Sequence, residues 1–123
     1  MPGTKPADPT RWNVYKFGGT SVASAECYRT VRDIILAAQQ STPKMAVVVS
    51  AMGGKPKVTD LLIDTVMLAA KGDLKGYEQT LSVVRKKHVA CATELFSAAG
   101  AQAYEADLDE DINNLRDILR AVS

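Results

Sequence analysis

The fold of this chain is decided by residues 12–21, WNVYKFGGTS, in which a short apolar run ends at two glycines. Residues 47–54, VVVSAMGG, repeat this arrangement, and a segment with helical periodicity follows each stretch. A strand that ends at glycines and leads into a helix can bind an anion, because the first N–H groups of the helix lack intrahelical partners and the helix dipole is positive there. Since Lys16 lies one residue before the first glycines, the pattern predicts a phosphate site, in particular for a nucleotide.

The composition is that of an ordinary globular chain. Of 123 residues, 46% are hydrophobic and 24% are charged, and the net charge is +1. This balance gives no case for nucleic acid or a membrane surface as a partner, because either would need clustered lysine and arginine. The one basic cluster, residues 85–88, is interpreted as a solvated helix face. The chain is long enough for one domain or part of one.

The order of the predicted elements is β-α-β-α-α-α. They are a flexible tail over residues 1–11, a strand over 12–17, a helix over 24–40, a strand over 45–49, and helices over 59–71, 74–99 and 107–122. Residues 101–106 are expected to link the last two helices, with Asp107 and Glu110 forming a capping box. The two strands and the helix between them make a right-handed parallel βαβ unit.

The sheet predicted in this way is unfinished. Residues 45–49 form an apolar run without alternation, which is typical of a strand buried on both faces. Two strands alone do not make a stable sheet. We therefore expect residues 12–123 to be the N-terminal portion of a larger α/β domain.

The strongest candidate site is the first glycine stretch. It supplies a cation from Lys16, backbone donors at Gly18 and Gly19, and hydroxyls at Thr20 and Ser21. It is neither a Walker A loop nor a Rossmann fingerprint, because the lysine precedes the glycines and the glycine spacing differs. The alternative is an ordinary turn between strand and helix with a solvated lysine.

The second candidate is the loop over residues 50–59. Its two glycines permit close backbone approach, Lys55 and Lys57 could reach an anion, and Thr59 could cap a helix or bind a substrate. Spacing alone favours a flexible surface loop.

The remaining reactive side chains are interpreted structurally. Cys27 and Cys91 are expected to be buried free thiols in a reducing compartment, since two cysteines inside helices form no disulfide framework. His88 is expected to be a partly buried core histidine. The acidic group at residues 107–111 is interpreted as a charged first helical turn. No metal site is predicted.

Three strings carry a resemblance to a known family. KFGGTS, followed by Val22 and Ala23, resembles the signature of aspartokinases in the amino-acid kinase family. Residues 47–62, VVVSAMGGKPKVTDLL, are similar to the family's second glycine- and serine-bearing segment. Residues 111–122 resemble the bifunctional aspartokinase–homoserine dehydrogenases of plant type. The resemblance runs from about Trp12 to the last residue.

The resemblance implies a three-layer α/β/α sandwich with a mainly parallel sheet, here incomplete. It implies transfer of the γ-phosphoryl of ATP, bound with Mg²⁺, to the β-carboxylate of L-aspartate, which gives 4-phospho-L-aspartate. This is the first step towards lysine, threonine, methionine and isoleucine. The implied catalytic residue is Lys16. The implied phosphate-binding residues are Lys16, Gly18, Gly19, Thr20 and Ser21, and the implied aspartate-binding residues are Ser50 and Thr59.

The resemblance also sets expectations for the rest of the protein. The family's acidic motif of His-Gly-Glu character is not among these residues, so the chain alone is expected to be an inactive fragment. NADP is expected only if a homoserine dehydrogenase domain follows. The full-length protein is expected to be a homo-oligomer, cytoplasmic or, in a plant or alga, plastidic. The alternatives are another family member that acts on a different carboxylate or carbamate, and a non-catalytic nucleotide-binding or interaction fragment.

Overall fold

A computed structural model describes residues 8–123. The tail predicted over residues 1–11 falls largely outside this range, and residues 8–11 form a turn in which the N–H of Arg11 donates to the carbonyl of Asp8 at 3.1 Å. The chain divides into two compact units, with the boundary between Gly53 and Gly54.

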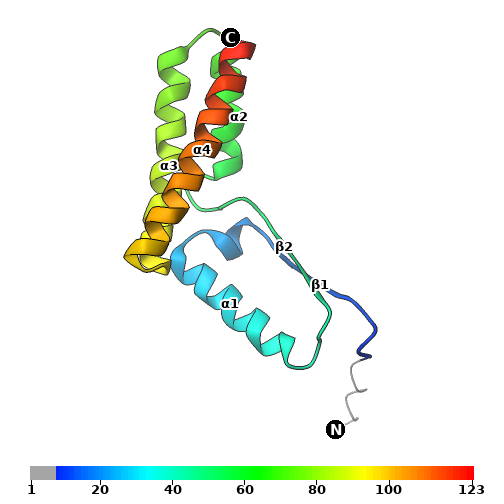
Figure 1. Cartoon of the computed structure of the whole chain (residues 1–123). Coiled ribbons are helices and arrows are strands. Elements are labelled where there is room, and N and C mark those ends of the chain that lie inside the picture. Colours follow the sequence, from blue (N-terminus) through cyan, green and yellow to red (C-terminus); the bar gives the residue numbers. More distant parts are fainter. Residues whose placement is uncertain (1–7) are drawn as a thin grey trace. The chain divides into compact units, whose positions relative to one another are not determined.

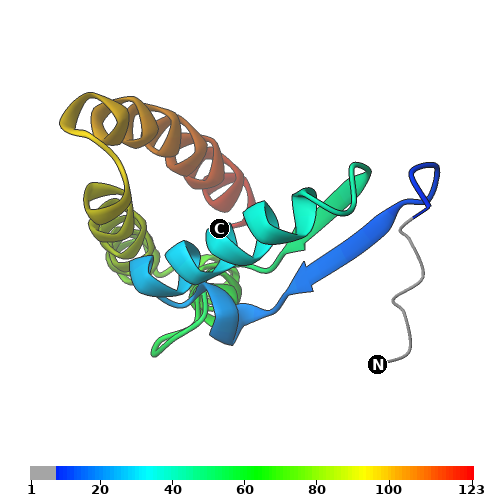
Figure 2. The ribbon, with the colours of Figure 1, turned by 90° about the horizontal axis from the view of Figure 1, so that it is seen from below.

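The first unit is a parallel βαβ arrangement (Figures 1 and 2). Its elements are β1 (Asn13–Phe17), the 3₁₀ helix η1 (Gly19–Val22), α1 (Ala25–Gln39) and β2 (Met45–Val49). The two strands pair in register from Asn13 opposite Met45 to Phe17 opposite Val49. Both strands therefore end at the same edge of the sheet, as the sequence predicts.

Alternation along β1 gives the sheet one covered face. Phe17 is buried with Val22 of η1 and Val31 of α1, and Tyr15, Tyr28 and Ile35 pack against them. Ser24, the first residue of the predicted helix, caps α1, because its hydroxyl oxygen accepts from the N–H of Cys27 at 3.3 Å. Ile34, three residues after Val31, is 44% exposed.

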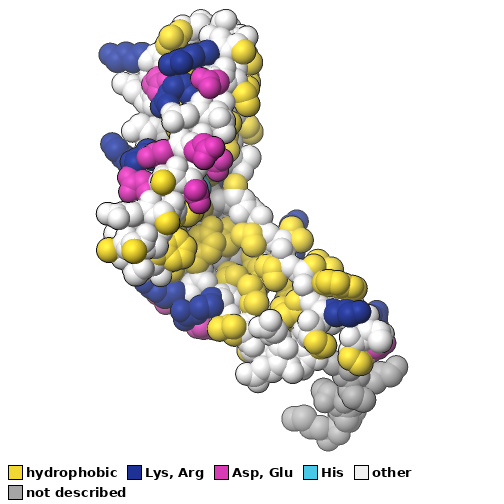
Figure 3. Space-filling view, viewed as in Figure 1, with side chains coloured by type: hydrophobic (Ala, Val, Ile, Leu, Met, Phe, Trp, Pro, Cys, Tyr) yellow, Lys and Arg dark blue, Asp and Glu magenta, His cyan; other side chains and the backbone are white. Residues whose placement is uncertain are grey.

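β2 has the predicted bounds but not the predicted burial. Val48 and Val49 are each 48% exposed, and Val47 is exposed as well. Figure 3 shows hydrophobic side chains over the surface of this unit. The exposure arises because the described sheet has two strands, so β2 has a neighbour at one edge only.

The second unit consists of three helices packed on one another (Figure 1). They are α2 (Val58–Ala70), α3 (Leu74–Leu95) and α4 (Ala98–Val122). Their core contains residues from all three: Ala69, Tyr77, Leu81 and Leu119, with Leu68 and Leu115 packed against them. Gly72, at a φ of +74°, makes the left-handed turn after α2, and Asp73 caps α3 by accepting from the N–H of Gly76 at 2.8 Å.

The inner face of α2 differs by one position from the prediction. The apolar spacing of Leu62, Val66, Ala69 and Ala70 predicts that they face inward. Val66 is instead 49% exposed and Ala70 is exposed, whereas Thr65 is buried. Thr65 can be buried because its hydroxyl donates to the carbonyl of Leu62 at 2.7 Å.

The junction of α3 and α4 was also predicted wrongly. α3 ends at Leu95, and α4 begins at Ala98, so the expected link over residues 101–106 is helical and Asp107 is not a cap. Ser97 is the cap, because its hydroxyl oxygen accepts from the N–H of Gly100 at 3.2 Å. The alanine-rich sequence after it has high helix propensity. Val122, expected inward, is exposed.

Together these elements form an α/β fold with an incomplete parallel sheet. Among residues 8–123 there is no helix whose length and apolar character would suit a membrane span.

Candidate functional site

The two glycine loops begin side by side at the carboxyl edge of the sheet. Beyond the last strand pair, the N–H of Ser50 donates to the carbonyl of Phe17 at 3.0 Å. This bond continues the ladder by one residue, so the loop after β1 and the loop after β2 leave the sheet together. Ligands of parallel α/β folds bind at this edge.

Gly19 and Gly53 bring the two loops into backbone contact. A Cβ atom on Gly53 would lie 2.0 Å from the carbonyl oxygen of Gly19, and a Cβ atom on Gly19 would lie 3.5 Å from the Cα of Gly53 and 3.8 Å from the Oγ of Ser50. No side chain fits at Gly53 unless the backbone moves. The structure thus joins Gly19, Ser50 and Gly53, which the sequence placed in two separate candidate sites.

Gly18 has a different environment. Its φ of −76° and ψ of 177° are extended backbone that any residue adopts, and no atom lies within 4 Å of the position of an added Cβ. The fold of the described chain therefore does not require glycine here. An open glycine does leave the backbone accessible to a ligand.

Lys16 lies on the sheet face away from α1. Tyr15 and Phe17, its neighbours on β1, pack on the α1 side, so the alternation of the strand directs Lys16 to the opposite side. Lys16 is exposed, and its ammonium group has no ion-pair partner within residues 8–123. Its charge is available to a ligand.

The two hydroxyl residues of the first loop have different environments. Thr20 is exposed, whereas Ser21 is half-buried. The N–H of Ser21 donates to the carbonyl of Gly18 at 3.0 Å, which closes the turn. The side chain of Ser21 lines a hollow of about 200 Å³ on the α1 side of the sheet, opposite to Lys16.

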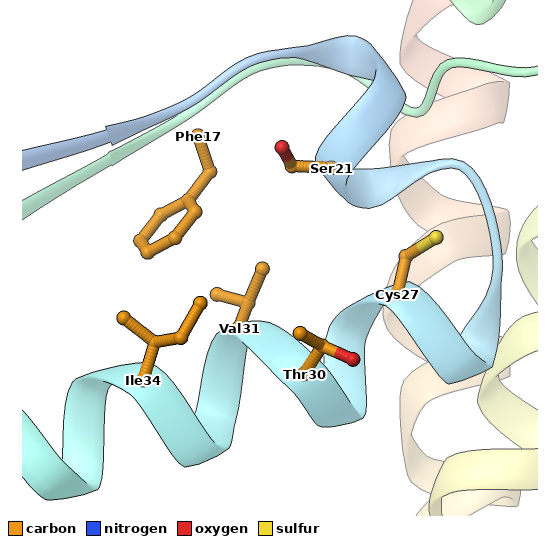
Figure 4. Close-up of a pocket in the computed structure, with 6 residues that line it drawn as sticks. All are labelled: Phe17, Ser21, Cys27, Thr30, Val31 and Ile34. Atoms are coloured by element: carbon orange, nitrogen blue, oxygen red, sulfur yellow. The ribbon is translucent and has the colours of Figure 1, made fainter.

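Figure 4 shows this hollow. Its other lining residues are Phe17, Cys27, Thr30, Val31 and Ile34. Cys27 and Cys91 form no disulfide, and both are half-buried rather than buried as expected. The hydroxyl of Ser24 donates to the Sγ of Cys27 at 3.3 Å and holds the pKa of this thiol below its ordinary value.

The two residues expected to bind aspartate belong to different units. Ser50, in the first unit, is exposed, and its hydroxyl donates to the carbonyl of Ala51 at 3.0 Å. Thr59, in the second unit, is exposed in the first turn of α2 and is not its cap, because Lys57 occupies that position. The Thr59 hydroxyl has no hydrogen-bond partner among residues 8–123.

The loop before α2 has one contact that the sequence did not indicate. The Nζ of Lys87, on α3, donates to the carbonyl of Pro56 at 2.7 Å. Lys55 and Lys57, on either side of Pro56, are exposed. The basic stretch 85–88 contains Lys87, but a contact over 31 residues has no local sequence signal.

Arg85 on α3 is paired with two carboxylates of α4 rather than solvated. The Nε of Arg85 donates to Asp109 at 2.6 Å, and its guanidinium also pairs with Glu105. The interpretation of residues 85–88 as a solvated face is therefore wrong for Arg85, and that of residues 107–111 as a first turn is wrong because they lie within α4. The hydrogen bond from Arg85 holds the pKa of Asp109 below its ordinary value.

Two further titratable side chains of the helical unit make contacts within the fold. His88 is half-buried, and its Nδ1 lies 2.7 Å from the carbonyl of Val84. Burial raises the pKa of Tyr104. Residues 8–123 contain no group of three histidine, cysteine or acidic side chains that could hold a metal ion.

These features define an α/β protein with a candidate anion site at the carboxyl edge of a parallel sheet. The sequence model of the amino acid kinase family matches residues 11–117. The chain belongs to this family. The predicted α/β class with an incomplete parallel sheet is confirmed and fits the family's fold.

The curated relatives are aspartokinases, alone or fused. The chain is 38% identical over 111 residues to a bifunctional aspartokinase/homoserine dehydrogenase of Arabidopsis thaliana, a match that covers 90% of this chain and 12% of that protein. A bifunctional relative from Daucus carota is 35% identical over 90% of this chain and 11% of its own length. An aspartokinase of Candida albicans is 31% identical over 89% of this chain and 20% of its own length. The chain thus spans roughly an eighth of the plant relatives' length.

Proposed function

We propose that this chain is part of an aspartate kinase, which transfers the γ-phosphoryl of ATP to the β-carboxylate of L-aspartate and gives 4-phospho-L-aspartate. One observation supports this above the others: an accessible glycine, Gly18, follows an uncommitted cation, Lys16, at the edge where both strands end. The names of the relatives supply the substrate class.

The residues of the first loop fit a phosphate group. Gly18 leaves its backbone open, Gly19 beside it is half-buried against the second loop, and Thr20 is exposed. When bound, the nucleotide would supply the phosphoryl group. Lys16 would neutralise charge on that group, and the N–H groups of Gly18 and Gly19 would donate to its oxygens. We assign no residue of this chain to Mg²⁺, which the kinase reaction uses with ATP.

Two residues differ in how directly they support the proposal. Thr20 can offer a hydroxyl from the same loop, whereas Ser21 faces the α1 side and would act through the turn that its N–H closes on Gly18. This placement of Ser21 favours a positioning role over direct phosphate contact.

The acceptor needs no general base. An aspartate carboxylate has an ordinary pKa near 3.9 and is already ionised at neutral pH. The enzyme must instead offset repulsion between two anions, and an uncommitted lysine provides this. Ser50 and Thr59 would orient aspartate with hydroxyls exposed at the start of the second loop and in the first turn of α2.

The test is aspartate-dependent ATP turnover by the complete gene product, with Lys16→Met against Lys44→Met. Lys44 is an exposed lysine that precedes β2 and serves as the matched control. Lys16→Met should lower kcat by about 10²–10³, as expected for loss of one preorganised charge, and Lys44→Met should leave it unchanged. Equal rates for the two variants would contradict the assignment of Lys16.

Plant relatives are named chloroplastic, which favours a plastid location if the source is a plant or alga. A homoserine dehydrogenase domain with NADP, and assembly into a homo-oligomer, remain proposals for the whole protein. Reading the transcript beyond the codon for Ser123 tests the first of these.

A further inference from the structure

The segment from Gly54 to Lys57 leads into α2 and carries two exposed cations. Lys55 and Lys57 flank Pro56, and Gly54 has a φ of +90°. All four residues are exposed, so few packing contacts define their conformation. A hydrogen bond from another element is therefore needed to fix the positions of Lys55 and Lys57.

That bond comes from α3. The Nζ of Lys87 donates to the carbonyl of Pro56 at 2.7 Å, which is a charge-assisted hydrogen bond of good length. Within residues 8–123, this is the one hydrogen bond from another helix to residues 54–57. The carbonyl of Lys57 accepts from the N–H of Leu61, but that bond belongs to α2 itself.

We propose that Lys87 is a positioning residue for the acidic substrate. It holds the Pro56 carbonyl, so that Lys55, Lys57 and the first turn of α2 with Thr59 form one preorganised surface for an anionic carboxylate. This inference rests on the proposed function, because the substrate is the dicarboxylate of that reaction. The ammonium group of Lys87 is bonded to the Pro56 carbonyl, so Lys87 itself does not touch the substrate.

The first experiment follows the loop without any need for activity. In Lys87→Met the aliphatic stem remains and the donor is lost. Trypsin can cut this segment only after Lys57, since a proline follows Lys55. We expect the initial cleavage rate after Lys57 to rise about fivefold in Lys87→Met, because removing one such bond changes local opening by roughly that factor.

The matched control is Lys86→Met, on the neighbouring exposed lysine of α3. Lys87→Arg keeps a cationic donor and should restore a rate near that of the unmodified protein. If Lys87→Met and Lys86→Met are cut equally fast, Lys87 does not hold the loop and the proposal is overturned.

The second experiment measures the kinetic consequence in the complete gene product. Lys87→Met should raise the KM for aspartate about fivefold, with kcat and the KM for ATP within twofold, and Lys87→Arg should reverse most of the change. A looser loop with an unchanged KM for aspartate would overturn the positioning role. Absence of aspartate-dependent turnover in the unmodified protein would overturn the proposed function and, with it, the role for aspartate, while the trypsin result would still decide whether Lys87 holds the segment.

Discussion

The two glycine loops have the same pattern in sequence but different surroundings in the structure. In the loop after β2, Gly53 is packed so closely on Gly19 that no side chain fits. In the loop after β1, Gly18 has open space around it and an ordinary backbone conformation. One glycine is thus explained by the fold, and the other is not. A ligand that approaches the backbone would explain the second.

Charged residues show the same contrast. Arg85 is committed to Asp109 and Glu105, and Arg116 donates from its Nε to Glu78 at 2.6 Å. Lys16 has no such partner in the described chain. Lys16 therefore differs from these two arginines, because its charge is unpaired, among the described residues, at the sheet edge where the glycines lie.

The largest effect is expected for Gly53→Ala. The added Cβ would overlap the Gly19 carbonyl, so the loops must separate, at a cost of about 3 kcal/mol. Thermal unfolding should show a lower midpoint for this variant. An unchanged midpoint would mean that the two loops are not in contact.

A smaller loss of about 1 kcal/mol is expected for Ser24→Ala, which removes the cap of α1. The variant also removes the hydroxyl that donates to Cys27, so the pKa of this thiol should rise. Thiol alkylation as a function of pH checks the second effect. A thiol that titrates at the same pH in both proteins would contradict the Ser24 contact.

The stability that Arg85 contributes through its ion pair should depend on pH. Arg85 lowers the pKa of Asp109 in the folded state, so the pair stabilises the fold above the ordinary aspartate value near 3.9, and this contribution is lost as the pH falls through the lower folded-state value. Arg85→Met should therefore lower the thermal midpoint at pH 7 by an amount that shrinks below pH 4. The pair is only half-buried, so solvent screening keeps this effect modest.

Lys16→Met is the control for that comparison, since Lys16 has no ion-pair partner in the described chain. Its thermal midpoint should match that of the unmodified protein at both pH values. A loss equal to that of Arg85→Met would show that Lys16 has a structural partner.

The parts of the fold that sequence predicted well are those with local signals. The bounds of β1, α1 and β2 follow from Ser24 as a cap and from the apolar runs beside it. The junction of α3 and α4 was missed because a glycine such as Gly100 typically ends a helix, although here Ser97 caps a helix that includes it. The glycine favours a helix end and the serine favours a helix start, and the structure follows the serine, whose hydroxyl caps α4.

The site was predicted only in part, for a similar reason. The motifs predict candidate residues in each loop, such as Lys16 and Ser50, but the contact of Gly19 with Gly53 and the bond from Lys87 to Pro56 join residues 34 and 31 positions apart. The pairing of Arg85 with Asp109 spans 24 residues. No periodicity or spacing in one sequence reports such pairs, because they are set by how the helices and strands pack.

The smallest effect on stability is expected for Gly18→Ala, and it gives the most direct test of the central claim. ATP affinity and the thermal midpoint should be measured together in the complete gene product. The account predicts an unchanged midpoint, which corresponds to a free energy of unfolding within about 0.5 kcal/mol of the original, and ATP binding weakened about tenfold, because the added methyl group occupies space left open for phosphate. Unchanged ATP affinity at an unchanged midpoint would contradict the claim that this loop binds the nucleotide.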